Sequence, residues 1–186
     1  MLSLRFDPFP VLETKRLVLH ALTKENSADI FLLRGNPEAM KYIGKPTLQT
    51  LLEVEQLIAA YQENVRDKIG ITWGITLKGE NRRLVGTIGF HKIDRPNYRA
   101  EIGYILHPDQ WGKGIMNEAI KSVLDYGFKE MDLHSIEARI DPKNQRSAQI
   151  LLKNGFEKEA YFKEAFYWKG AFIDTEVYSL IAAVKR

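Results

Sequence analysis

A strand-like run, a short loop with two glycines and a long amphipathic helix follow one another in the second half of the 186-residue chain. The loop reads Trp111-Gly112-Lys113-Gly114 and lies directly before the helix. The N-terminus of a helix presents four backbone N–H groups without intrahelical partners and a partial positive charge, so it attracts anions. Glycine lets that backbone approach a phosphate because it has no Cβ. The segment therefore predicts a phosphate-binding loop.

Two common phosphate-binding motifs do not fit this loop. The sequence contains no Gly-x-x-x-x-Gly-Lys-Ser/Thr motif, which a P-loop requires. Asn117 stands where a dinucleotide fingerprint needs its third glycine or alanine, and the strand order before it differs from that of a dinucleotide fold. A tight strand-to-helix turn that binds nothing remains the alternative for an isolated Gly-x-Gly.

The sequence lacks the residues and motifs that several other catalytic mechanisms require. The chain has no cysteine, so disulfides, thiolate nucleophiles and an acetyl-cysteine intermediate are excluded. No Gly-x-Ser-x-Gly elbow of a serine hydrolase occurs. The four histidines form no close pair and no His-Glu-x-x-His spacing, so we predict no metal site; they are His20, His91, His107 and His134.

Hydrophobic periodicity indicates which elements position the loop. Apolar residues that step by three and four predict an amphipathic helix from Thr50 to Val65, and a shorter helix begins at Asn26 or Ser27 and reaches Leu33. Before the loop we expect strands over Arg16–His20, Ile71–Leu77, Arg83–Ile93 and Ala100–Leu106, with a turn at Lys78-Gly79-Glu80-Asn81.

After the loop the predicted order is helix, strand, helix and two strands. The long helix runs to about Met131, and further along we expect a strand over Ser135–Ile140, a helix over Ser147–Lys153 and two strands between Phe156 and Ala182, joined at Lys169-Gly170. This order predicts an α/β protein with a sheet of mixed direction and a βαβ crossover in its second half. No linker divides the chain, so we expect one domain over residues 1–186.

Composition and charge limit the classes of partner. Hydrophobic residues make up 45% of the chain and charged residues 27%, which is an ordinary globular balance. The net charge of +3 is spread without basic runs, so direct nucleic-acid binding is not predicted. No run approaches the roughly 20 apolar residues that span a membrane, and the N-terminus has no signal segment. We expect a cytoplasmic protein without membrane contact.

The segments around the loop resemble the GNAT superfamily of N-acetyltransferases. The usual pyrophosphate loop of these enzymes reads Arg/Gln-x-x-Gly-x-Gly/Ala, and Trp-Gly-x-Gly followed by Glu-Ala is typical of the Rim-type branch, which resembles ribosomal-protein N-terminal acetyltransferases. Further similar segments occur in the expected order along nearly the whole chain, although His20 stands where an arginine is common. They are 12–19, 36–40 (the loop after the first helix), 86–90, 100–104, 144–147 and 154–156, followed by Gly170, Asp174 and 178–180.

This resemblance implies a fold and a cofactor. The fold is a central mixed, mostly antiparallel, splayed sheet flanked by helices, in which the strand over Glu101–Leu106 separates from its neighbour. The bound group is acetyl-CoA, the acetyl donor, and no metal is implied. The backbone of the splayed strand would pair with the pantetheine arm, and the loop amides would hold the pyrophosphate. The expected cofactor-binding residues are Ile105, Leu106, Gly112, Lys113, Gly114, Ile115, Met116, Asn117, Asn144 and Ser147.

The resemblance also implies two catalytic residues. Glu101 would lie beside the thioester and act as the general base, and Ser147 would donate a hydrogen bond to the departing sulfur. Alternatively, Glu101 is an ion-pair partner of Arg99 or Arg139, and Asn144 or Ser147 only caps a helix. Tyr104 and Tyr161 are other possible donors, although a buried tyrosine more often has its hydroxyl satisfied inside the protein.

The resemblance also implies that the acceptor is a primary amine, and we expect it to attack bound acetyl-CoA directly. An α-amine, with a reference pKa of about 7.7–8.0, needs less help from a base than lysine, at about 10.4. We therefore expect the N-terminus of a ribosomal or other protein as acceptor. A polyamine, amino acid or antibiotic is the alternative, and a non-catalytic acetyl-CoA-binding module is a third possibility.

One aromatic cluster late in the chain concerns packing and oligomeric state, which the sequence leaves open. Aromatic side chains mostly pack inside their own domain, so we expect the cluster to be core rather than a partner surface. Its members are Phe162, Phe166, Tyr167, Trp168 and Phe172.

Overall fold

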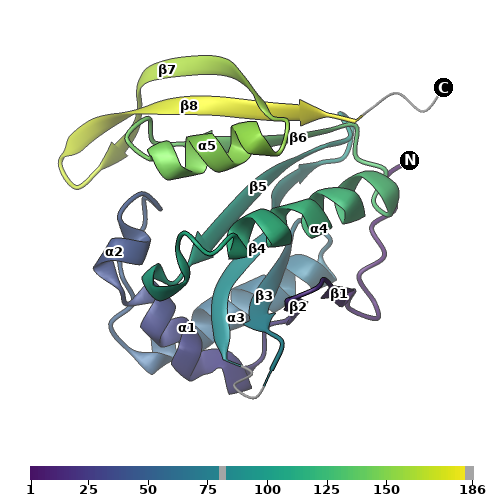
Figure 1. Ribbon diagram of the computed structural model, residues 1–186, viewed down its shortest axis with the longest axis vertical. Coiled ribbons are helices and arrows are strands. Elements are labelled where there is room, and N and C mark those ends of the chain that lie inside the picture. The colour runs from purple at the N-terminus through teal and green to yellow at the C-terminus, as the bar shows by residue number, and fades with distance from the viewer. Residues whose placement is uncertain (80–82, 183–186) are drawn as a thin grey trace.

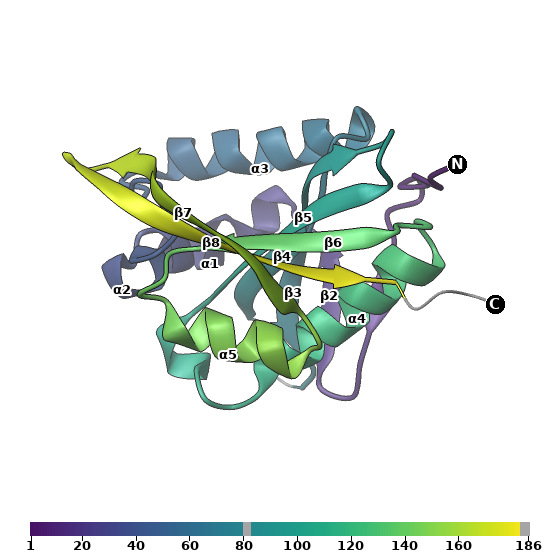
Figure 2. The same ribbon diagram turned by 90° about the horizontal axis from the view of Figure 1, so that it is seen from above.

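The computed structural model describes residues 1–79 and 83–182, which form one eight-stranded sheet with helices on both faces (Figures 1 and 2). The strands are β1 (Leu12–Glu13), β2 (Leu17–Ala21), β3 (Ile71–Leu77), β4 (Leu84–Asp94), β5 (Arg99–Leu106), β6 (Ser135–Ile140), β7 (Glu157–Trp168) and β8 (Ala171–Ile181). The α-helices are α1 (Ser27–Arg34), α2 (Pro37–Met40), α3 (Leu51–Arg66), α4 (Ile115–Lys129) and α5 (Gln145–Lys153).

The strand order in the sheet is β1-β2-β3-β4-β5-β6-β8-β7. All neighbours are antiparallel except β5 and β6, which α4 connects as a parallel crossover. The middle strands are covered on both faces, and six consecutive residues of β3, Ile71 to Thr76, are buried. In a sequence, strands that are buried on both faces form nearly continuous apolar runs. The predicted bounds of β3 therefore agree with those in the structure.

Two hydrophobic clusters lie on opposite faces of the sheet. On one face α4 contributes Met116, Ala119, Ile120 and Val123 to the main core. On the other face α1, α2 and α3 form a second cluster, to which Ile105 of β5 belongs. Because side chains alternate along a strand, Glu101 and Gly103 share the face of Ile105. Tyr104 lies on the opposite face, toward α4.

Strands β5 and β6 separate after a short contact. They pair only at Arg99 with Ser135, Ala100 with Ile136 and Glu101 with Glu137. Beyond Glu101, β5 stays paired with β4, while β6 pairs along its whole length with β8. Within the described residues, the backbone of β5 beyond Glu101 pairs with no strand on the side of β6, and Figure 1 shows the two strands diverging there. The splayed, mostly antiparallel sheet that the sequence predicted is confirmed.

Most predicted elements are confirmed, with shifts of one or two residues at their ends. Thr50 caps α3 in a capping box with Glu53, so this helix begins at the residue after Thr50. Helix α5 begins at Gln145, two residues before the predicted start, because the Asn144 side chain accepts a hydrogen bond from the Ser147 amide at 3.2 Å. The crossover from β5 through α4 to β6 is the predicted βαβ unit.

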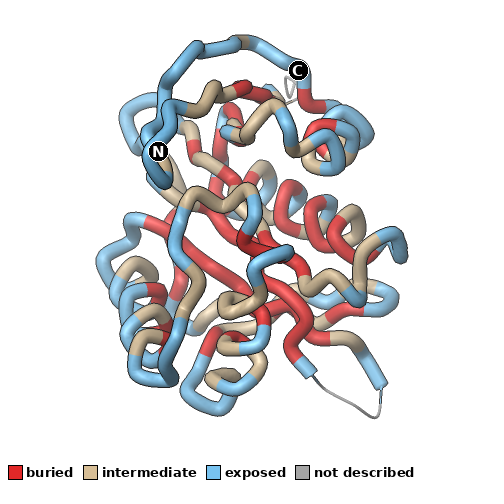
Figure 3. The backbone as a smooth tube through the Cα atoms, turned by 90° about the vertical axis from the view of Figure 1, so that its left-hand side faces the viewer, coloured by how far each residue is buried: buried red, intermediate tan, exposed pale blue. Residues whose placement is uncertain are grey.

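The prediction that the late aromatic cluster is core was wrong. Tyr167 and Phe172 are 61% and 63% exposed, and Phe162 and Phe166 are also exposed. These residues lie on the β7–β8 hairpin, where β7 is the edge strand of the sheet and is almost wholly exposed, as the pale blue stretch at the top of Figure 3 shows. An edge hairpin has no second layer of structure to bury its side chains, and the sequence carries no signal of that position.

Two short elements were not predicted. Asn36 caps α2 through the amides of Glu38 and Ala39, where the sequence suggested a loop. β1 pairs with β2 over only two residues. Of the predicted turn at 78–81, Glu80 and Asn81 lie outside the described residues. Among the helices of the described residues, none has the length and hydropathy of a membrane span.

Candidate active site

The predicted phosphate loop has the backbone that anion binding requires. Gly112 and Gly114 have φ values of +74° and +75°, a region that side chains with a Cβ rarely adopt. Gly114 is the N-cap of α4, and no side chain caps this helix end within the described residues. A Cβ on Gly112 would meet nothing within 4 Å. The loop therefore offers unpartnered amides over open space, which suits a pyrophosphate.

Trp111 fixes the loop between β5 and α5. Its Nε1 donates to the Leu106 carbonyl at 2.9 Å, and the Arg146 guanidinium lies over its ring, 4.7 Å from the centroid. The indole thus joins the end of β5, the loop and the first turn of α5. The sequence identified Trp111 only as part of the motif, because its contact with Arg146 depends on the tertiary fold.

Arg16 brings a further positive charge to the loop. Its Nη1 donates to the Lys113 carbonyl at 2.9 Å, and its Nε pairs with Glu118 Oε2 at 2.6 Å. An ideal Cβ on Gly114 would lie 3.5 Å from Arg16 Nη2. Sequence reasoning missed Arg16, because its partners lie about 100 residues away and no local pattern indicates them.

Glu118 anchors the N-terminal strand to the first turn of α4. One carboxylate oxygen accepts from Thr14 Oγ1 at 2.6 Å and from the Arg16 amide at 2.9 Å. Burial alone would raise the pKa of this carboxyl, but the hydrogen bonds from Thr14 and Arg16 outweigh burial and lower the pKa below 4.5. The charged form is therefore the one that the fold stabilises.

We expect Glu118→Gln to destabilise the protein by about 1–2 kcal/mol at neutral pH, because hydrogen bonds to a charged acceptor are lost. The folded pKa is lowered, so this contribution is present above the unfolded pKa and disappears as pH falls through the folded value. Urea unfolding at pH 7 and near pH 3 measures the difference. Asp125→Asn, which removes an exposed partner of Lys129 on the same helix, should change stability by less than about 0.5 kcal/mol. An equal loss in both variants, or a Glu118→Gln effect that persists in acid, would contradict this role.

Glu101 lies where β5 and β6 separate. Its Oε2 is 3.4 Å from Lys92 Nζ and 3.9 Å from Arg139 Nε, and its side chain is 21% exposed. The ion-pair alternative is therefore present, although with Lys92 and Arg139 rather than Arg99, which pairs with Glu137 at 2.8 Å. Oε2 is buried and accepts no hydrogen bond from the described residues. It retains the capacity to accept a proton.

His91 lies next to Glu101 on the adjacent strand and the same face. A Cβ on Gly103 would lie 2.9 Å from the imidazole, so glycine makes room for this ring. Burial, together with the positive charges of Arg34, Lys45 and Lys92, lowers the pKa of His91 to about 4. His91 is thus neutral at physiological pH. The sequence treated it only as a histidine without a metal-binding partner.

Tyr104 and Ser147 meet on the opposite face of the sheet. The Tyr104 hydroxyl is buried without a well-formed hydrogen bond to the described residues, yet it is close enough to Ser147 for that hydroxyl to influence its pKa. Burial raises the pKa of Tyr104 to about 12, so it stays protonated. Tyr161, the other possible donor, is exposed on β7 and donates to Asp174.

Asn117 lies in the first turn of α4, Asn144 lies directly before α5, and Ile105 and Leu106 end β5. Asn144 is the N-cap of α5, so a helix-capping role, which was one alternative for Asn144 or Ser147, is present for Asn144. Asn117 Oδ1 accepts from Asn154 Nδ2 at 3.0 Å, which ties α4 to the end of α5. Ile115 and Met116 are buried in the core, so only their amides could face a ligand.

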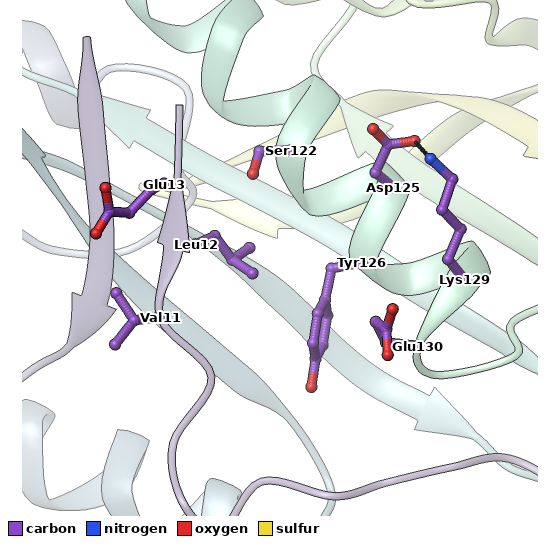
Figure 4. Close-up of a pocket in the computed structure, with 8 residues that line it drawn as sticks. All are labelled: Val11, Leu12, Glu13, Ser122, Asp125, Tyr126, Lys129 and Glu130. Carbon is purple, nitrogen blue, oxygen red and sulfur yellow. Dashed lines mark ion pairs between the residues drawn. The ribbon is translucent and has the colours of Figure 1, made fainter. Parts of the chain in front are cut away.

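A separate hollow of about 280 Å³ lies between β1 and α4, away from the loop (Figure 4). Its polar groups partly neutralise each other, since Asp125 pairs with Lys129 at 2.9 Å. Neither the glycine loop nor Glu101 contributes to it. Its lining residues are Val11, Leu12, Glu13, Ser122, Asp125, Tyr126, Lys129 and Glu130.

Comparison with known proteins gives a consistent result. The family model described as an acetyltransferase (GNAT) domain matches residues 16–157. The chain is 36% identical over 173 residues to the N-acetyltransferase YoaA of Bacillus subtilis, which covers 93% of this chain and 97% of that protein. A solved GNAT-family acetyltransferase from Bacillus anthracis superposes with a TM-score of 0.82 at 28% identity, covering 92% of this chain and 98% of that chain.

Relatives with different acceptors are also similar. Spermidine N(1)-acetyltransferase of Escherichia coli is 26% identical over 154 residues, which covers 83% of this chain and 80% of that protein. Ribosomal-protein-serine acetyltransferase of Escherichia coli is 34% identical over 100 residues, with 53% and 55% covered. The family match spans the splayed strand, the glycine loop and α5, and with these relatives it identifies the chain as an acetyl-CoA-dependent N-acetyltransferase of the GNAT family, with relatives among the Rim-type enzymes.

Proposed function

We propose that the acceptor is the α-amine of a protein N-terminus, ribosomal or other. The observation that carries this choice is the exposed aromatic surface of the β7–β8 hairpin. Phe166 of this hairpin packs against Gly44 of the loop after α2, where an added Cβ would lie 2.7 Å from the ring. An exposed surface of this kind offers contact area to an extended polypeptide, whereas small ligands favour enclosed pockets.

In the proposed reaction the acceptor amine forms an N–C bond with the acetyl carbon as the C–S bond breaks. Glu101 takes the proton of the amine, directly or through one water. The amides of residues 112–117 hold the pyrophosphate, and Lys113, Asn144 and the backbone of Ile105 and Leu106 orient the donor. Acetyl-CoA supplies the activated acetyl group when bound.

The departing thiolate needs stabilisation on the other face of the sheet. Tyr104 and Ser147 both offer a hydroxyl there, and the buried Tyr104 hydroxyl has no well-formed partner among the described residues. A reference thiol has a pKa of about 8.5, well below the value of about 12 for Tyr104. Tyr104 is therefore suited to donate a hydrogen bond to the thiolate, and solvent supplies the final proton.

We expect Tyr104→Phe to lower kcat by about 10- to 100-fold, because a charge-assisted hydrogen bond in the transition state is lost. Ser147→Ala should have a smaller effect, and the KM for acetyl-CoA should change little in either variant. Steady-state release of CoA measures both constants. Tyr126→Phe is the matched control, since its pKa is also about 12 but it lies near the far end of α4. A kcat for Tyr104→Phe equal to that of the control would remove Tyr104 from the mechanism.

The acceptor proposal is tested with a panel of amines at fixed acetyl-CoA. The panel contains peptides with a free N-terminus, the same peptides blocked at the α-amine but carrying lysine, free amino acids and spermidine. We expect the highest kcat/KM with free N-termini and acetylation mapped to the α-amine by mass spectrometry. Turnover of spermidine alone would favour the small-amine function, for which the spermidine acetyltransferase relative is the supporting observation. Tight acetyl-CoA binding without turnover of any amine would favour a binding module.

A further inference from the structure

Arg34, at the end of α1, is a half-buried cation without an anionic partner among the described residues. Its Nη2 donates to Tyr61 Oη at 2.6 Å, and its Nη1 lies 3.6 Å from Met40 Sδ. The Nε is buried and has no hydrogen-bond acceptor among the described residues. No carboxylate from residues 1–79 or 83–182 lies within 4.0 Å of this guanidinium. A charge removed from water without a partner is costly, so this position favours an anion supplied from outside.

This cation lies on the same face of the sheet as Glu101, the proposed general base. Helices α1 and α2 pack on that face against β4 and β5, in the cluster that contains Met40 and Ile105. Arg34 and Lys45 are both close enough to His91 to affect its ionisation, and His91 is the cross-strand neighbour of Glu101. Arg34 and Glu101 thus lie on the same face of the sheet, and His91 is near both.

The charges around this region are predominantly positive. Lys45, in the loop after α2, is exposed and forms no ion pair with the described residues. Lys92 and Arg139 already pair with Glu101. Glu137 is likewise held by Arg99 and Arg139. An acceptor with additional positive charge would be repelled, and one with a negative charge would be attracted.

We propose that Arg34, assisted by Lys45, binds a carboxylate that the acceptor carries close to its reactive amine. The proposal rests on the proposed transfer to an amine beside Glu101 and adds the chemical class of the acceptor. Two sources share this chemistry, namely an acidic side chain near a peptide N-terminus and the α-carboxylate of a free amino acid. Polyamines lack such a group and should be poor acceptors.

The test compares acceptor pairs that differ only in charge. The first pair is a short peptide with N-terminal Ser-Asp and its Ser-Asn counterpart; the second is serine and serine amide. With wild-type protein we expect kcat/KM to be about tenfold higher for the acidic member of the favoured pair, because each charge-assisted contact discriminates by roughly this factor. In Arg34→Met and in Lys45→Ala this ratio should fall toward one, through KM rather than kcat. Preference within the peptide pair or the serine pair identifies the source of the carboxylate.

Tyr61→Phe is the matched control for Arg34→Met, because it removes the same hydrogen bond but keeps the charge. It should retain the wild-type ratio. Lys45 is exposed, so Lys45→Ala should leave the fold intact, and its effect on the kcat/KM ratio reports on acceptor binding. A wild-type ratio of one or less in both pairs, or a ratio unchanged in both variants, would overturn the proposal.

Failure of the proposed function would be distinguishable from failure of this inference. If no amine is acetylated, calorimetric titration of the CoA-loaded protein with the Ser-Asp and Ser-Asn peptides still tests the anion site, because it measures the affinity for each peptide. Preferential binding of the acidic peptide that is lost in Arg34→Met would still support the anion site. Equal binding of the two peptides would contradict it.

Discussion

Replacing Glu101 with glutamine should lower kcat by about 10²- to 10⁴-fold, which is the range that a positioned general base contributes. Glutamine keeps the size of the side chain and can still pack beside Gly103, but it cannot accept a proton. The KM for acetyl-CoA should stay within about threefold of wild type, since the pyrophosphate loop lies on a different segment. Steady-state kinetics with the best peptide acceptor measures both constants.

The pH profile separates a lost base from a damaged fold. In Glu101→Gln the residual rate should rise more steeply with pH, because only acceptor amines that are already neutral can react, with an α-amine pKa of about 7.7–8.0. Glu159→Gln is the matched control; this carboxylate on β7 is exposed and lies 3.7 Å from Arg99. A Glu101→Gln kcat within about threefold of that control would show that Glu101 is only an ion-pair partner of Lys92 and Arg139.

Replacing Gly114 with glutamate should weaken acetyl-CoA binding by about 100-fold or more. The substitution adds a negative charge at a helix N-terminus that otherwise favours anions, and the φ of +75° disfavours any side chain. It also places a carboxylate next to Arg16, whose charge would otherwise face the pyrophosphate. Calorimetric titration with acetyl-CoA measures the change in Kd.

Gly170→Glu controls for backbone strain. Gly170 has a φ of +83° and no atoms within 4 Å of an added Cβ, but it lies at the β7–β8 turn, far along the chain from the loop. Both variants should lose similar thermal stability, and only Gly114→Glu should lose cofactor affinity. If folded Gly114→Glu protein bound acetyl-CoA as tightly as Gly170→Glu, the pyrophosphate would lie elsewhere.

The sequence predicted the central strands and the long helices well because local patterns encode them. β3 is an apolar run because neighbours bury it on both faces, and the apolar residues of α3 recur every three or four positions because one side of the helix is buried. The two glycines of the loop are needed because the backbone there has positive φ. These signals are short-range. The splay of β5 from β6 came instead from the resemblance, since no local pattern in Glu101–Leu106 predicts that pairing will end.

The side chains that the sequence missed depend on contacts between distant segments. Arg16 reaches Glu118 across about 100 residues, and His91 reaches Gly103 only because β4 and β5 pair in one register. Sequence reasoning did not single out Arg34, because its lack of a counter-ion among the described residues can be recognised only in three dimensions. The exposed aromatic residues of the hairpin illustrate the reverse error, because residue type alone does not say whether another layer covers a strand.

The most direct test of this account is a crystal structure of the protein with acetyl-CoA. The account predicts the pyrophosphate on the amides of residues 112–117 and the pantetheine arm along β5 between Glu101 and Leu106. The thioester should lie within reach of Glu101 on one face of the sheet and of Tyr104 and Ser147 on the other. A cofactor bound instead in the hollow between β1 and α4 would contradict the assignment. A thioester too far from Glu101 to be reached directly or through one bridging water would contradict it as well.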